Sequence, residues 1–159
     1  MTQDAVNSQD PFVQIVSTQT GTLQTLTTLT PADDTIPQNT EGAEVLTVTI
    51  TPKFSTSRLE IVFISTIAVK DLTTPQSIIT ALFQDTTADA LAATCVRANT
   101  NGSINCYLHH VMTSGTTSAT TFKIRVGPDT NTLYINGTNV GAQTYGGVSA
   151  TRLVVKEYI

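Results

Sequence analysis

Charge is scarce in this sequence of 159 residues. Charged residues make up 13% of the chain, against about a quarter in an average soluble protein, and tryptophan is absent. The eight lysines and arginines are scattered along the chain and outnumbered by twelve aspartates and glutamates, so the net charge is −4. Because affinity for nucleic acid depends on basic side chains that neutralise phosphates, we expect no nucleic-acid partner.

Long apolar runs are missing as well. No run approaches the roughly 20 residues that a membrane-spanning helix needs. The polar start Met1–Asp4 is not the basic beginning of a secretory signal. We therefore expect a soluble protein that is made in the cytosol and does not insert into a membrane.

Recognisable catalytic and metal-binding motifs are also absent. The sequence has no nucleophile elbow, P-loop or dinucleotide fingerprint. Asp33 and Asp34 lack the regular acidic spacing of a calcium loop, and the adjacent His109 and His110 point to opposite faces of a strand, so they cannot grip one metal together. We expect one histidine to be an interior or interface residue and the other to be solvated. The sequence predicts no catalytic residue, no cofactor and no metal site.

Cysteine occurs only twice. Cys95 and Cys106 flank the turn-forming stretch Asn99–Ser103, and two cysteines that face each other across a hairpin are close enough for a disulfide. Because no secretion signal is visible, we favour reduced, small apolar side chains. Two free thiols are the prediction, and a bridge is the alternative.

Alternation with a period of two residues is what the sequence has in abundance, and it is typical of strands with one buried side. In Leu108–Val126, two such strands flank a loop rich in Gly, Ser and Thr, which predicts a β-hairpin. About eight or nine short strands separated by turns, with no convincing helix, predict an all-β protein. The expected fold is a single jelly-roll-like β-sandwich with a short N-terminal arm.

One domain fits this length. We assign residues 1–30 to an N-terminal arm or attachment segment and residues 31–159 to the β-sandwich head. The first ten residues are polar and unpatterned, which fits a frayed terminus or an arm that orders on a partner. Thr22–Thr30 spaces its leucines by three, but its threonines favour extended chain, so we expect a strand or an extended linker there.

Two expected strands, Leu59–Val69 and Leu153–Val155, are apolar on both faces. A sandwich buries one face of each sheet, so the second face must be covered by another subunit or by a loop. We predict a non-covalent homotrimer on this ground. The candidate trimer contacts are Ile61, Phe63, Ile67, Leu153 and Val155.

Several stretches resemble a known group of proteins. In chain order they are DDTIPQNTEGAEVLTVTITPKFSTSRLEI, ALFQDTTADALAA, LHHVMTSGTTSATTFKIRVG and INGT…YGGVSATRLVVKEYI. Together they cover roughly Pro31 to Ile159 and resemble small β-sandwich proteins and terminal modules of tailed bacteriophages, usually described as tail-fibre, receptor-binding or other virion appendage proteins. The resemblance implies a virion protein made in the host bacterial cytoplasm, a homotrimer of jelly-roll heads, and no catalytic residue.

Three functions remain open. The head of a tail fibre or tip would bind a glycan or protein of the host surface through its loops. A capsid decoration (cement) or head-fibre protein would contact other virion proteins through its N-terminal arm. A glycan depolymerase would need paired carboxylates in a groove, whereas the acidic residues here lie mostly in turns or at strand ends. We predict a non-enzymatic structural virion protein, with the first role ahead of the second.

The candidate target-binding loop joins the two strands of the expected hairpin. Its hydroxyl side chains donate and accept hydrogen bonds, which suits a sugar-rich or polar surface. The loop can equally be a structural hairpin tip, with specificity in Lys70–Ser77 or Gly137–Gly146. Its candidate residues are Thr113, Ser114, Gly115, Thr116, Thr117 and Ser118.

Overall fold

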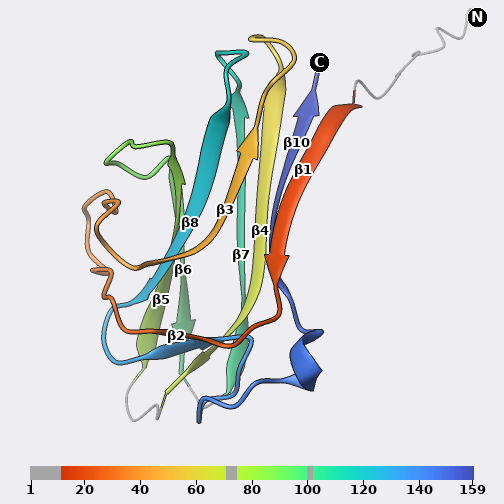
Figure 1. Cartoon of the computed structure of the whole chain (residues 1–159). Coiled ribbons are helices and arrows are strands. Elements are labelled where there is room, and N and C mark those ends of the chain that lie inside the picture. The colour runs from red at the N-terminus through yellow and green to blue at the C-terminus, as the bar shows by residue number, and fades with distance from the viewer. Residues whose placement is uncertain (1–11, 71–74, 100–101) are drawn as a thin grey trace, which may run out of the picture.

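The computed structural model describes residues 12–70, 75–99 and 102–159, and its strands form two antiparallel sheets packed face to face (Figure 1). The strands are β1 (Phe12–Thr20), β2 (Gln24–Leu26), β3 (Ala43–Ile50), β4 (Arg58–Val69), β5 (Gln76–Gln84), β6 (Ala92–Ala98), β7 (Ser103–Thr113), β8 (Thr120–Pro128), β9 (Leu133–Ile135) and β10 (Thr151–Tyr158). A 3-10 turn, η1, covers Tyr145–Gly147. Within the described ranges no helix is long and apolar enough to cross a membrane.

The first sheet has the order β1-β10-β4-β9-β2, and β7 also pairs with β4. The second sheet has the order β3-β8-β5-β6. Along the chain the strands alternate between the sheets: β3 is followed by β4 in the other sheet, β5 and β6 lie in the second, β7 in the first and β8 in the second again. Two four-stranded layers, β1-β10-β4-β7 and β3-β8-β5-β6, connected in this way form a jelly roll. The predicted all-β sandwich is confirmed.

The core lies between the two sheets and is built from one parity of each strand. On β8, Phe122, Ile124 and Val126 are fully buried, while the alternate residues Thr121 and Lys123 are half-buried on the outside. Successive side chains of a strand point to opposite faces, so the two-residue period of the sequence is read directly as inside and outside. The expected half-buried strands are therefore present.

The expected hairpin in Leu108–Val126 is wrong. β7 pairs with β4, whereas β8 pairs with β3 and β5, so the loop between them crosses from the first sheet to the second. The same is true of β6 and β7 on either side of the Asn99–Ser103 turn, of which residues 100–101 lie outside the described part. Alternation in the sequence shows that a strand has one buried face. Because both sheets bury one face in the same core, alternation does not indicate which strand it pairs with. Cys95 on β6 is exposed, Cys106 on β7 is buried, and both are free thiols.

The boundary expected at residue 30 is also corrected. β1 pairs with β10 from Phe12 opposite Tyr158 to Thr20 opposite Thr151, and β2 pairs with β9. Leu26 of β2 is buried, as the strand expected in this region requires. The sandwich thus includes residues 12–30, and the rest of the expected arm, residues 1–11, lies outside the described residues.

The loop between β2 and β3 covers the outer face of the second sheet. Ile79 and Phe83 of β5 are buried although they alternate with the core residues Ile78 and Leu82. The loop is held there by backbone hydrogen bonds from Asn39 N to Ala88 O (2.8 Å) and from Ala90 N to Pro37 O (3.0 Å). On this sheet a strand that is apolar on both faces is therefore covered by a loop of its own chain.

Phe122→Ala tests the position of the core. The phenyl ring fills space between the sheets, so its loss should lower the free energy of unfolding by about 3–5 kcal/mol. Thr121→Ala on the outward face of the same strand is the control and should change it by less than about 1 kcal/mol. Urea unfolding measures both, and similar losses for the two variants would contradict the inward direction of Phe122.

Candidate functional site

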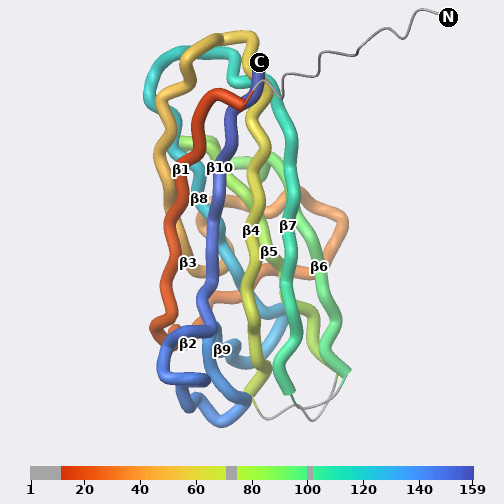
Figure 2. Tube along the Cα trace, turned by 90° about the vertical axis from the view of Figure 1, so that its right-hand side faces the viewer, coloured from red at the N-terminus to blue at the C-terminus, as the bar shows by residue number. Residues whose placement is uncertain are grey.

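The outward side chains of β1, β10, β4 and β7 form an open surface on the first sheet, which faces the viewer in Figure 2. We call this surface the outer face. The register aligns its residues in rows: one row runs from Gln19 through Arg152 and Ile64 to Tyr107. The residues of the outer face are Phe12, Ile15, Ser17, Gln19, Arg58, Glu60, Val62, Ile64, Thr66, Asn105, Tyr107, His109, Val111, Arg152, Val154, Lys156 and Tyr158.

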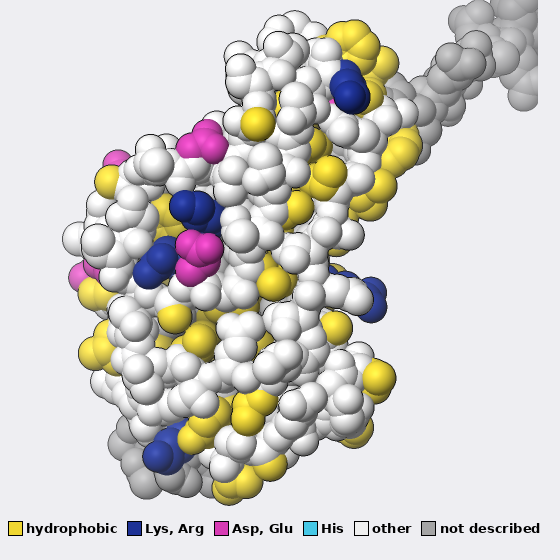
Figure 3. Space-filling model, in the orientation of Figure 1, with side chains coloured by type: hydrophobic (Ala, Val, Ile, Leu, Met, Phe, Trp, Pro, Cys, Tyr) yellow, Lys and Arg dark blue, Asp and Glu magenta, His cyan; other side chains and the backbone are white. Residues whose placement is uncertain are grey.

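Large apolar side chains are exposed on all but one strand of this surface. Ile15 is 53% exposed, Ile64 49%, Tyr107 53% and Val111 44%. Figure 3 shows apolar side chains along the right-hand outline of the molecule, where Figure 1 places β1 and β10. Contiguous exposed apolar surface on a soluble protein marks an interaction site. The outer face is therefore the candidate functional site.

The predicted trimer contacts do not lie on the outer face. All five are completely buried in the interior of a single chain: Ile61, Phe63, Ile67, Leu153 and Val155. They belong to the inward parity of β4 and β10, which packs against the second sheet. The sequence shows that both parities are apolar, but the fold decides which parity is used inside, and it leaves Ile64 and Val154 on the outside. The prediction of these five contacts is wrong for this reason.

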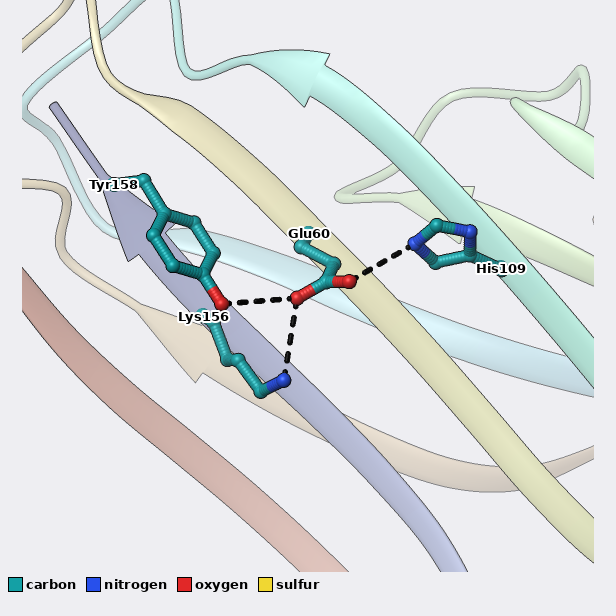
Figure 4. A network of polar contacts seen from close by, with 4 residues as sticks. All are labelled: Glu60, His109, Lys156 and Tyr158. Carbon is teal, nitrogen blue, oxygen red and sulfur yellow. Dashed lines mark hydrogen bonds and ion pairs between the residues drawn. The ribbon is translucent and has the colours of Figure 1, made fainter. Parts of the chain in front are cut away.

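A polar cluster crosses the outer face near the end of the sheet at which Phe12 lies (Figure 4). Glu60 of β4 lies 3.2 Å from Lys156 Nζ, accepts a hydrogen bond from the Tyr158 hydroxyl at 3.1 Å, and lies 3.1 Å from Nε2 of His109. The hydrogen bond from Lys156 lowers the pKa of Glu60, partial burial opposes this, and Tyr158 and His109 lower it further. The same pair raises the pKa of Lys156. The cluster joins three strands, and both oxygens of its carboxylate are engaged.

The two histidines divide as predicted. His109 is exposed on the outer face, and His110 is partly buried on the inward side of β7. Burial lowers the pKa of His110, and neighbouring His109 adds to this. Within residues 12–70, 75–99 and 102–159, no three His, Cys, Asp or Glu side chains are grouped so that they could hold a metal ion.

Glu157 was not singled out in the sequence, although it is a fully buried carboxylate. One oxygen accepts hydrogen bonds from Lys53 N (2.8 Å), Phe54 N (3.2 Å) and Ser57 Oγ (2.6 Å). The other accepts one from Gln14 Nε2 at 2.6 Å. Burial alone would raise the pKa of Glu157, but these donors outweigh it and hold the pKa below its ordinary value.

Glu157 thereby fastens the β3–β4 loop and the edge strand β1 to β10, beside the outer face. The sequence pattern could have identified Glu157 as an inward residue, because it follows the apolar residues Leu153 and Val155 at a spacing of two. A carboxylate at an inward position needs several donors to be tolerated there.

The candidate target-binding loop is only partly free. Ser114 is buried: its backbone N–H bonds Ser57 O at 2.8 Å and its hydroxyl bonds Phe54 O at 2.7 Å. Gly115 N bonds Ser55 O at 2.9 Å, and the positive φ of 68° at this glycine is one that other residues rarely adopt. The remaining candidates are accessible, with Thr116 half-buried and Thr113, Thr117 and Ser118 exposed.

This loop shares one end of the sandwich with the start of β1. The register places Phe12, Tyr158, Arg58 and Thr113 in one row across the first sheet. We call this the terminal end (Figure 1). At the opposite, far end lie the described parts of the alternative loop Lys70–Ser77, whose residues 71–74 are outside the described ranges, and the loop Gly137–Gly146. The loop candidates thus point in opposite directions.

Comparisons with known proteins find no family and only weak likeness to solved structures. No family model matches the chain, and no curated protein is detectably similar to it. Among solved structures, chains of infectious bursal disease virus strains Gx and Gt match over 91% and 92% of this chain, with identities of 8% and 10% and TM-scores of 0.43 and 0.42. This chain spans 37% and 38% of theirs.

The enzymatically active domain of bacteriophage CBA120 tailspike protein 4 matches over 79% of this chain and 18% of its own length, with 17% identity and a TM-score of 0.24. Likeness at this level does not extend to function. The jelly-roll assignment therefore rests on the strand order of this chain.

Glu157→Gln tests the buried carboxylate. A pKa that is lowered in the folded state contributes stability above the unfolded value, about 4.3, and this stability is lost as the pH falls through the folded value. The variant should lower the free energy of unfolding at pH 7 by about 1–3 kcal/mol, and its stability should fall less steeply below about pH 4.3. Exposed Glu44→Gln is the control. Urea unfolding between neutral and acidic pH measures the effect, and an unchanged acid slope would rule it out.

Proposed function

We propose that this chain is a non-enzymatic structural protein of a virion whose copies pack through the outer face into a homotrimer. The observation that carries the proposal is the exposed apolar surface around Ile64, which lies between Arg152 and Tyr107 in the register of three neighbouring strands. The resemblance of the segments between Pro31 and Ile159 to phage appendage proteins supports the virion setting.

Charge on the outer face favours a cyclic arrangement over a two-fold dimer. The face carries Arg58, Arg152 and Lys156, and among the described residues Glu60 is its one carboxylate. Two outer faces packed on each other would bring like charges together, which costs free energy. A head-to-tail contact between the outer face and a different surface avoids this and closes into a ring when the rotation is suitable. A homotrimer is such a ring.

A non-enzymatic role is supported by the chemistry of the outer face. Glu60 is engaged by Lys156, Tyr158 and His109 on an open sheet surface. Glycoside hydrolysis needs two carboxyl groups that flank a substrate in a groove. A carboxylate that accepts hydrogen bonds from side chains of neighbouring strands, on an open sheet surface, is suited to holding those strands together.

The two ends of the sandwich would have different neighbours in a tail-fibre or tip head and in a capsid decoration or head-fibre protein. If residues 1–11 attach the protein to the particle, the loop Thr113–Ser118 faces the particle, because it lies at the same end of the sandwich as Phe12. The far end then faces away, and we propose it as the target-binding end of a tail fibre or tip head. In the alternative role of a capsid decoration or head-fibre protein, the terminal end would meet the shell.

Ile64→Lys tests self-assembly. Ile64 is half exposed in the single chain, so a lysine is tolerated by the fold but adds a cation to the centre of the outer face. Light scattering at micromolar concentration should give the mass of a trimer for the wild type and a shift towards monomer for the variant. Thr49→Lys, on the exposed side of the second sheet, is the comparison: a trimeric mass would show that this side is not the surface opposite the outer face, and a shift towards monomer would show that it is. A monomeric wild type would refute the homotrimer.

Antibody labelling of intact particles in the electron microscope tests the virion setting. We expect label on the particle, at the tail for a fibre or tip head and on the shell for a decoration protein. Particles purified from a lysate that contains the protein, but carrying no label, would contradict both roles.

A further inference from the structure

A hollow of about 290 Å³ lies on the outward side of the second sheet. It is formed by β3 and β8, by the end of β5, by the turn that follows β5 and by the loop that precedes β3. We call it the side hollow. Figure 3 shows basic and acidic side chains together in this part of the surface, over the strands that Figure 1 labels β3 and β8. Its volume is close to the lower limit of about 300 Å³ for pockets that hold small molecules.

The floor and one wall of the side hollow are fixed by the sandwich. Phe83 lines the hollow and is only 1% exposed, so its ring forms the floor. The Arg125 guanidinium donates from Nε to Glu41 O (2.8 Å) and from Nη2 to Gly42 O (2.7 Å). Both acceptors are backbone oxygens just before β3. The arginine is therefore held along the start of that strand and keeps its remaining N–H groups for other partners.

A second wall is the turn after β5, which is fastened to β8. Asp85 has a φ of 52°, its backbone N–H donates to Thr121 O (2.8 Å), and its Oδ1 accepts from Thr121 N (2.8 Å). Asn39, on the loop before β3, donates from its side-chain amide to Thr87 O at 3.1 Å. Groups that are held in place before a ligand arrives lose less entropy when it binds.

Charges of both signs line the side hollow without neutralising one another in ion pairs. Lys123 of β8 and Glu44 of β3 both line it, and within the described ranges neither takes part in an ion pair. Asp85 and Arg125 add one further charge of each sign, so the four charges balance. Hydrogen-bond donors and acceptors therefore surround a space in which neither sign of charge prevails.

This balance favours an uncharged ligand that carries several hydroxyl groups. An anionic ligand would be repelled by the two carboxylates, and a cationic one by Lys123 and Arg125. A hydroxyl group donates one hydrogen bond and accepts others, so it can contact a carboxylate and a cation at the same time. Hydrogen bonds to charged partners are shorter and stronger than those between neutral groups.

We propose that the side hollow binds a single uncharged sugar residue. Glu44 and Asp85 accept hydrogen bonds from its hydroxyl groups, and Lys123 and Arg125 donate to them. The site goes beyond the structural role proposed above, because it lies on the second sheet and requires neither self-assembly nor the far end of the sandwich.

Titration of isotope-labelled protein with glucose, galactose and N-acetylglucosamine tests the site by NMR. We expect at least one of these neutral sugars to shift the backbone signals of Thr86 and Lys123 at millimolar concentration. Lys123→Met and Glu44→Gln should each weaken that binding by about tenfold or more, because each removes a hydrogen bond to a charged group. Lys53→Met removes an exposed lysine outside the hollow, on the loop between β3 and β4, and should bind like the wild type.

Glucuronic acid and glucosamine test the class of ligand, and both should bind more weakly than the neutral sugar. The amide spectrum of each variant shows that it is folded. No shift with any of the three neutral sugars, or binding that both pocket variants retain, would overturn the site. Tighter binding of a charged sugar would overturn the uncharged class. A monomeric wild type that binds sugar would refute the homotrimer and leave this site standing.

Discussion

The two sheets of this sandwich bury one shared apolar core, and this packing decides what every strand leaves outside. On β4 the core takes Ile61, Phe63 and Ile67, so the alternate residues Val62 and Ile64 remain on the surface. The apolar outer face is thus a consequence of a strand that is apolar on both sides. On the second sheet the β2–β3 loop covers the corresponding side chains of β5, and on the first sheet a second copy is the proposed cover.

Two carboxylates of the first sheet follow the same division between inward and outward positions. Glu157 lies at an inward position and is tolerated because four donors replace the water it loses. Glu60 lies at an outward position, where Lys156, Tyr158 and His109 engage it across three strands. Both carboxylates thus hold strands of the first sheet together, one from the inside and one from the outside.

The kind of candidate site, an apolar face of a sheet, could be predicted from the sequence, but the residues that form it could not. The excess of apolar positions in Leu59–Val69 correctly indicated a strand with apolar side chains on both faces. The choice of Ile61 and Phe63 as contacts failed, because both parities look alike in the sequence and only the opposing sheet distinguishes them. The exposure of Tyr145 could not be foreseen either, since it depends on the hydrogen bonds that Asn136 makes with β1 and on a turn at positive φ.

Local alternation and turn residues are enough to predict that the chain is all β, where most strands lie, and that His109 and His110 face opposite ways. Three further properties depend on the packing of the two sheets: β7 and β8 belong to different sheets, residues 12–30 are part of the sandwich, and Ile61, Phe63 and Ile67 of β4 point inward. Strand partners are chosen by contacts between residues far apart in the chain, and a two-residue period carries no information about which distant strand supplies the other half of the core.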